Sequence, residues 1–351
     1  MNEIQRTTRT VCRLHLPILV MAFCLPFSPV TLPAEDTRSI SPIDGVSSQL
    51  PLEAWARHEI ELALNSHDYS HAEETLLQAE VQHPNPQLLS LLGRVFFLDH
   101  KYLNAAIALK KAEALKPLDE KDRFTLVMAY VAMGRTDWAR PELEKLAEIS
   151  PRNPLYLYWQ GRLDYDRQDL SAAAAKFEKV IALDSEFMKA YDNLGLCLEG
   201  LAKYDEAIQQ YQHAIQLNRE HSINSAWPAL NLGALLIKLG RLEEAQPLLK
   251  ESLQFDPNFP QAHYQLGVLL EKRKEMPLAV EELKQSAVLD PANPQPHYAL
   301  MRIYRLTGNM EQAKRELEIF QTLKDKEPSP RLETTNRISA ETDLRPSGGR
   351  D

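Results

Sequence analysis

Residues 191–211 read YDNLGLCLEGLAKYDEAIQQY. Two small residues, Gly195 and Ala207, stand twelve positions apart, and the bulky Tyr211 follows four positions after the alanine. Residues four apart share one face of an α-helix, and small residues let two helix backbones approach closely. The stretch therefore predicts two antiparallel helices joined by a short turn.

The same spacing recurs along the chain. Glycines at 93, 161, 195, 233 and 267 are separated by 68, 34, 38 and 34 residues, which is a 34-residue period with Val127 in one glycine position and four extra residues near 222–225. An alanine follows each of these positions by twelve residues: Ala105, Ala139, Ala173, Ala207, Ala245, Ala279 and, after Met301, Ala313. This regularity indicates a repeated helical hairpin. The extra residues either lengthen a loop or add about one turn of helix.

Four further glycines are expected to end first helices in the left-handed conformation that glycine adopts easily. They are Gly134, Gly200, Gly240 and Gly308.

These columns of residues resemble the tetratricopeptide repeat family, most clearly in YDNLG at 191–195 together with YDEAI at 204–208. The resemblance implies an all-α fold, a right-handed superhelical α-solenoid of stacked helix-turn-helix hairpins. It also implies a concave groove, lined by the first helices, that binds a protein or peptide segment.

The predicted organisation has five parts. Residues 1–34 form a signal peptide, 35–51 a flexible linker and 52–85 a degenerate N-terminal hairpin, while 328–351 form a disordered tail. Seven repeat units fill residues 86–327: 86–119, 120–153, 154–187, 188–221, 226–259, 260–293 and 294–327.

The N-terminus has the pattern of an export signal. Arg6, Arg9 and Arg13 precede an apolar stretch over 14–30, and Ala34 offers a small residue for cleavage. The stretch contains three prolines and is short for a bilayer span, so no stable membrane span is expected after signal removal. The prediction is export to the periplasm or the exterior, with cytoplasmic retention as the alternative. Cleavage would leave Cys197 as the one cysteine.

Charge and motifs limit the possible functions. The formal charge of −9 and the pI near 5.7 disfavour nucleic-acid partners, which need a basic surface. The sequence has no phosphate-binding glycine loop, nucleophile elbow or zinc helix motif, so we expect no catalytic residue, cofactor or metal. The main hypothesis is an exported scaffold or adaptor in envelope complex assembly or secretion. The alternative is an enzyme, or a subunit of one, that acts on glycans or peptides through a polar cluster around Gln160 and Asp164; an internal Asp–Arg pair would also explain that cluster.

The resemblance places residues three before, one after and four after each glycine position in the groove. Tyrosine and arginine are frequent there, and both dominate binding hot spots. Arg162, flanked by Tyr158 and Tyr165, is the strongest candidate, although the aromatic residues could simply pack between helices. Asn193 and Asn231 match an asparagine that can face a bound backbone or hydrogen-bond within the helix face. The candidates are Arg94, Phe97, Phe124, Tyr158, Arg162, Tyr165, Asn193, Asn231, Tyr264, Tyr298, Arg302 and Arg305. The two-lysine, two-asparagine, one-arginine set that holds chaperone C-termini in this family is not reproduced, because Tyr158, Trp227 and Asn231 stand where basic residues would be expected.

Overall fold

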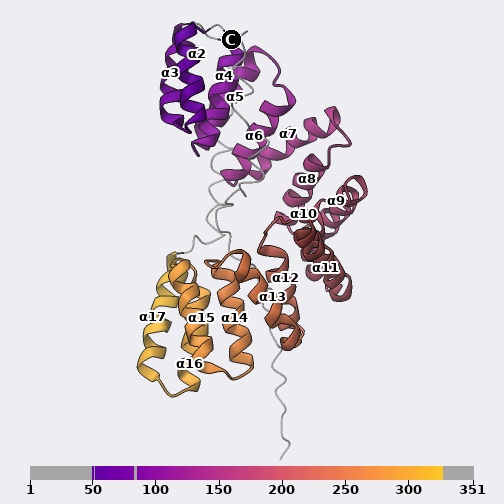
Figure 1. Ribbon diagram of the computed structural model, residues 1–351, viewed down its shortest axis with the longest axis vertical. Coiled ribbons are helices and arrows are strands. Elements are labelled where there is room, and N and C mark those ends of the chain that lie inside the picture. The colour runs from indigo at the N-terminus through magenta and orange to yellow at the C-terminus, as the bar shows by residue number, and fades with distance from the viewer. Residues whose placement is uncertain (1–49, 51, 83–84, 327–351) are drawn as a thin grey trace, which may run out of the picture. The chain divides into compact units, whose positions relative to one another are not determined.

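The computed structural model describes residues 50, 52–82 and 85–326, and within them the protein is all-α (Figure 1). The predicted signal peptide, the tail at 328–351 and all of the linker except Leu50 lie outside the described residues. Sixteen helices in the described part of the chain pack as consecutive pairs, which is the solenoid arrangement that the spacing predicts.

Each hairpin has a first and a second helix. The first helices are α2 (Ala54–Asn65), α4 (Pro86–Leu98), α6 (Glu120–Ala132), α8 (Pro154–Asp166), α10 (Met188–Gly200), α12 (Trp227–Lys238), α14 (Pro260–Lys272) and α16 (Pro294–Leu306). The second helices are α3 (Tyr69–Gln82), α5 (Tyr102–Leu115), α7 (Thr136–Ile149), α9 (Leu170–Leu183), α11 (Tyr204–Glu220), α13 (Leu242–Phe255), α15 (Met276–Leu289) and α17 (Met310–Lys326).

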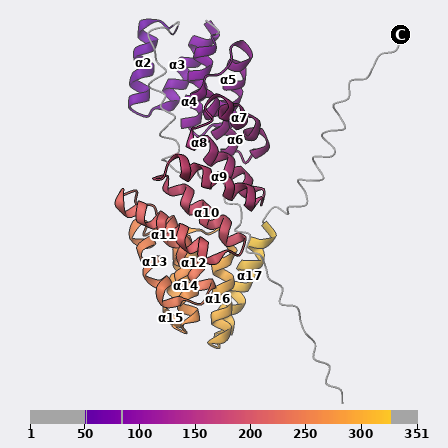
Figure 2. The same ribbon diagram turned by 90° about the vertical axis from the view of Figure 1, so that its right-hand side faces the viewer.

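The helices divide into two compact units. Among the described residues, those up to 139 form unit 1, with α2 to α6 and the start of α7, and those from 140 to 326 form unit 2, with the rest of α7 and α8 to α17. Figures 1 and 2 show the hairpins α12–α13, α14–α15 and α16–α17 of unit 2 stacked side by side.

The glycine and the bulky residue sixteen positions later form the contact at the centre of each hairpin. A Cβ atom built on Gly195 would lie 2.5 Å from Tyr211 Cε1, and one on Gly161 would lie 2.8 Å from Phe177 Cε1. Tyr211 and Phe177 are fully buried. The glycine is therefore needed because the partner ring occupies the volume of its missing side chain.

Asparagine and proline start several of the first helices. The Asn85, Asn153 and Asn293 side chains accept hydrogen bonds from the backbone N–H two residues later, at 2.8 to 3.0 Å, and the proline that follows each is suited to the first helical turn. At the opposite ends, Gly134, Gly240 and Gly308 have the predicted positive φ. The prediction for Gly200 is wrong: it ends α10 in the helix, and Ala202 takes the left-handed conformation instead, with φ 59°.

The four extra residues lengthen both a helix and a loop. Helix α11 has 17 residues, against 14 in α9 and α13. In the loop that follows, Ser222 and Asn224 have positive φ. The Asn218 side chain donates to the Ser225 carbonyl and accepts from the Ser225 N–H, both at 2.9 Å, which fixes the loop against α11.

The first helices form a row within each unit. In the described residues, α8, α10, α12, α14 and α16 contact one another in sequence, as do α4 and α6, whereas neighbouring second helices approach less closely. The first helices therefore lie on the inside of the local curve. We call the solvent-facing side of this row in unit 2 the first-helix face.

Candidate functional site

The three candidate residues of unit 1 lie inside the protein. Arg94, Phe97 and Phe124 are at most 7% exposed. Arg94 Nη1 lies 2.9 Å from Asp122 Oδ1 in a buried ion pair that joins α4 to α6. These three side chains are part of the packed interior and offer little surface to a ligand.

Unit 2 brings several candidates together in what we call the Arg162 cluster: Arg162 and Tyr158 on α8, Asp192 and Asn193 on α10, and Asn231 on α12. Arg162 is partly exposed, and its guanidinium lies close to the Tyr158 hydroxyl; burial acts to lower the Arg162 pKa, but this hydroxyl raises it above its usual value. The Asn193 amide donates to the same hydroxyl at 3.4 Å and to the Lys189 carbonyl at 2.8 Å. Three consecutive first helices thus contribute polar groups to one place.

Two atoms of the Arg162 cluster are unsatisfied. Arg162 Nε and Asn193 Oδ1 are buried and have no hydrogen-bond partner. Arg162 also makes no salt bridge with any described residue, although the charges of Asp166 and Asp192 act on it from farther away. Buried polar atoms are normally paired, so these two mark a place where a ligand can complete the hydrogen bonding.

Asp192 is the acidic residue of the Arg162 cluster. Burial raises its pKa from 3.8 to about 6, against the opposing effects of the hydrogen bond from Asn231 and the charge of Arg162. Burial also raises the pKa of Tyr165 and of Asp166. Asn231 is thus already engaged with Asp192, while Tyr165 is partly exposed at the edge of the same cluster.

The remaining candidates lie toward the C-terminal end of the first-helix face. Tyr298 is 46% exposed, and its ring packs against Phe320 with centroids 5.2 Å apart. The Arg302 guanidinium lies 5.9 Å from the Tyr298 ring centroid and forms a two-point ion pair with Glu271. Arg305 is exposed, and Tyr264 is partly exposed. This second group offers an aromatic and arginine surface, but the Arg302 guanidinium is already paired with Glu271.

The polar residues of the third unit are accounted for internally. Asp164 forms ion pairs with Arg140, at 2.9 Å, and with Lys176. Gln160 Nε2 donates to the Leu143 carbonyl at 3.4 Å. This is the internal Asp–Arg pair that the sequence left open.

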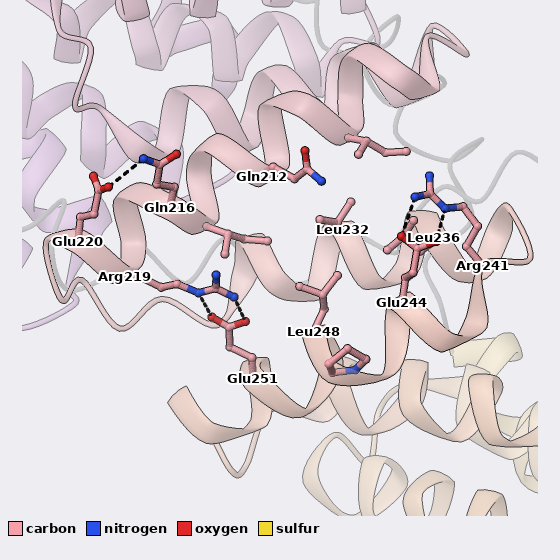
Figure 3. A pocket seen from close by; sticks show the side chains of 13 residues that line it. Gln212, Gln216, Arg219, Glu220, Leu232, Leu236, Arg241, Glu244, Leu248 and Glu251 are labelled. Carbon is pink, nitrogen blue, oxygen red and sulfur yellow. Dashed lines mark hydrogen bonds and ion pairs between the residues drawn. The ribbon is translucent and has the colours of Figure 1, made fainter.

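A cleft that the sequence interpretation missed lies between second helices α11 and α13 (Figure 3). Its volume is about 740 Å³, and Leu232 and Leu236 of α12 line it together with apolar residues of the two walls. Arg219 pairs with Glu251 near one end, and Arg241 pairs with Glu244 near the other. The one signal for it in the sequence is the longer spacing between Gly195 and Gly233, because the cleft lies at that joint.

Other chemistry has little support in the described residues. Cys197 is a buried free thiol, and burial raises its pKa to about 12. Residues 50, 52–82 and 85–326 contain no cluster of three or more His, Cys, Asp or Glu side chains placed to hold a metal ion. In the same residues, no helix has both the length and the apolar character that a membrane span requires.

Comparison with known families assigns the fold. Two tetratricopeptide repeat models match the chain, one at residues 186–258 and the other at 59–120, 124–186 and 230–294, and the latter alone covers more than half of it. The chain belongs to the tetratricopeptide repeat family. Its relatives include TPR repeat-containing protein MJ1428 of Methanocaldococcus jannaschii, 25% identical over 163 residues (45% of this chain, 28% of that one), and BBSome complex member BBS4 of Bos taurus, 25% identical over 168 residues (48% and 31%). The region in which this chain matches them therefore covers less than a third of the length of either relative.

Solved structures support the same fold. One of a tetratricopeptide repeat protein from Parabacteroides merdae has a TM-score of 0.59 at 17% identity, over 76% of this chain and 97% of that one. The APC/C hetero-tetramer Cut9–Hcn1 contains a chain with a TM-score of 0.58 at 18% identity, over 77% and 54%. PilF of Pseudomonas aeruginosa has a TM-score of 0.52 at 20% identity, over 58% and 91%. At these identities the likeness shows the tetratricopeptide repeat solenoid alone.

Proposed function

We propose that this tetratricopeptide repeat protein is an exported scaffold that binds a protein or peptide segment on the first-helix face of unit 2. The single observation that carries the proposal is Arg162, a half-buried guanidinium with an unsatisfied Nε and no salt bridge to the described residues. Tyr165 is partly exposed on the same helix, whereas Tyr158 is buried and packs against Phe177 and Phe187. Tyrosine and arginine are the residue types that contribute most at protein interfaces.

The N-terminal sequence and the similar proteins support the setting that we propose for this binding. The N-terminal pattern of arginines and apolar residues favours export, and an envelope assembly or secretion complex is the setting we propose. Two of the similar proteins are described as members of multi-subunit complexes, the BBSome and the APC/C hetero-tetramer. A repeat solenoid with a long continuous face suits that use because it can hold one extended segment against several repeats at once.

Partner capture tests the proposal. The full chain and a variant carrying Arg162→Ala with Tyr165→Ala are immobilised, and proteins retained from an extract of the source cells are identified. The variant should retain at least one specific partner at least about thirtyfold less, because loss of a hot-spot arginine and an aromatic neighbour costs roughly 2 kcal/mol or more.

The matched control is Arg167→Ala, which removes an exposed arginine just beyond the end of α8. It should retain the same partners as the unchanged protein. Equal recovery of every partner by the Arg162→Ala, Tyr165→Ala variant would show that the first-helix face is not the binding surface.

A further inference from the structure

Two second helices of unit 2 depart from the residue type that their repeat position has elsewhere in the chain. Leu248 of α13 stands fifteen residues after Gly233, and Ile319 of α17 stands eighteen residues after Met301. The residues at the position of Leu248 in the other hairpins are Ala108, Glu142, Lys176, Gln210, Glu282 and Glu316. Those at the position of Ile319 are Lys111, Lys145, Lys179, His213, Glu251 and Gln285. Stacking of the hairpins therefore does not require a large apolar side chain at either position.

Leu248 lines the cleft between α11 and α13, together with Leu232 and Leu236 of α12 (Figure 3). On α11, Ile208 and Ile215 line the same cleft and are seven residues apart, so they lie on one side of that helix. Leu248 is only half-buried although its neighbours in the cleft are apolar. An apolar groove between two helices has the shape that accepts the apolar side of a third helix.

The outer side of α17 has apolar residues of the kind that such a groove accepts. Ile319 is 41% exposed and Leu323, four residues later, is partly exposed, so the two lie on one side of the helix. Arg315 and Lys326 lie on the same side, one before and one after this pair. Ala313 is buried toward α16, the helix against which α17 packs in the described residues, and lies on the opposite side. We call Arg315, Ile319, Leu323 and Lys326 the α17 ridge.

The cleft and the α17 ridge match in length. Ile208 and Glu220 are the first and last residues of α11 that line the cleft, and they are twelve residues apart. Arg315 and Lys326 are eleven residues apart. At 1.5 Å per residue these spans are about 18 and 16 Å along their helices. The two cations of the α17 ridge can therefore reach both ends of the cleft.

The charges of the two surfaces are complementary. Each end of the cleft has two acids and one base, because one carboxylate accompanies the ion pair that lies there. The residues are Arg219, Glu220 and Glu251 at one end, and Asp205, Arg241 and Glu244 at the other. Arg315 and Lys326 are exposed, and neither forms an ion pair with a described residue. A free cation at each end of the ridge thus meets an excess of acid at each end of the cleft, which favours docking of one on the other.

We propose that a second copy of this chain docks its α17 ridge into the cleft between α11 and α13. The contact is heterologous, because it joins the cleft of one copy to the ridge of another, and each pair of copies keeps one free cleft and one free ridge. Copies therefore add head to tail. The interface uses second helices, so it is separate from the first-helix face and goes beyond the segment binding proposed above.

Sedimentation velocity of the purified protein tests this docking. The mass of the natural protein should rise from one copy to several between about 1 and 100 μM, a range typical of small interfaces. Leu248→Glu blocks the cleft and Ile319→Glu blocks the ridge, and each change should weaken association at least about tenfold, because it buries a charge without a partner. Both variants should fold, since Glu282 and Glu316 occupy the position of Leu248 in the next two hairpins and Ile319 is exposed.

Mixing the two variants is the decisive measurement. The Leu248→Glu variant keeps its ridge and the Ile319→Glu variant keeps its cleft, so one intact contact is possible between them. An equimolar mixture should therefore associate as tightly as the natural protein and stop at two copies. Gln321→Glu is the matched control, because it adds the same charge to another exposed side of α17 and should leave association unchanged.

Three results overturn the proposal. A natural protein with a single mass at every concentration would leave the cleft to a helix of another protein. Association that survives either Leu248→Glu or Ile319→Glu would place the contact elsewhere. Two variants that are folded by circular dichroism, that do not associate alone and that form no dimer when mixed would exclude a heterologous contact. None of these results bears on partner capture through Arg162, so the two proposals fail separately.

Discussion

Asn231 donates its side-chain amide to both carboxylate oxygens of Asp192, at 3.0 and 3.1 Å. The contact joins α12 to α10 across the first-helix face. It also explains why a buried acid is tolerated there, because both oxygens accept hydrogen bonds in a place that water hardly reaches.

Replacing Asp192 by Asn should stabilise the protein at neutral pH. In the folded protein, burial holds the Asp192 pKa at about 6, above its ordinary value of 3.8, so the folded state binds the proton more tightly than the unfolded state does. The free energy of unfolding of the natural protein should therefore fall as the pH rises from about 4 to 7, by a contribution on the order of 3 kcal/mol. The variant should gain about 1–3 kcal/mol at pH 7.5 and almost nothing at pH 4, as urea denaturation at each pH would measure.

The control for this measurement is Asp325→Asn, which changes an exposed carboxylate near the end of α17. It should shift stability by no more than about 0.5 kcal/mol. A gain for Asp192→Asn that is the same at pH 4 and pH 7.5 would contradict the assigned titration.

Gly195→Ala should destabilise unit 2. The added methyl group would meet the Tyr211 ring at 2.5 Å, and the ring is enclosed on all sides. Overpacking of this kind costs typically 1–3 kcal/mol, which exceeds the roughly 1 kcal/mol that alanine gains over glycine within a helix. The melting temperature should fall by several degrees.

Gly200→Ala is the matched comparison on the same helix. Its added methyl group would meet only the terminal methyl of Leu170, which can rotate away. The change should be neutral within about 1 kcal/mol. Equal destabilisation by the two changes would mean that the Gly195 contact is not special.

Arg94→Met should destabilise unit 1 because it leaves Asp122 buried without its cation. Breaking a buried pair by removing one partner costs roughly 3–5 kcal/mol, whereas replacing both partners by apolar residues costs much less. Arg94→Met with Asp122→Leu should therefore recover a large part of the lost stability in a denaturation experiment. Full destabilisation by the double change would show that the ion pair itself, and not the orphaned acid, carries the effect.

The mature natural protein should begin at Glu35 and lack Cys12 and Cys24. Intact-mass measurement and N-terminal sequencing of protein purified from its own cells would test this cleavage. A natural product that retains Met1 would refute both the cleavage and the export proposed from it.

Local sequence was enough to predict the repeated unit. The glycine of a first helix and the bulky residue sixteen positions later, as in Gly195 and Tyr211, belong to one hairpin, so their contact depends on fixed spacing and a short turn. For the same reason the sequence alone could predict the left-handed glycines that end first helices, as with Gly134 and Gly240. The exception is Gly200. The turn after α10 has its left-handed residue at Ala202 instead, because a short turn can place that residue at more than one position.

Only the tertiary structure distinguished the three arginines that share a position in the repeat. Arg94 pairs with Asp122, 28 residues later, and Arg302 pairs with Glu271, 31 residues earlier. The two spacings differ, so the repeat pattern predicts neither partner. The residues at those two spacings from Arg162 are Ala190 and Val131, which carry no charge, and Arg162 forms no salt bridge with a described residue. The physical reason is that hairpin formation depends on contacts within about 34 residues of regular sequence, whereas charge compensation depends on which side chains stacking brings within hydrogen-bond distance.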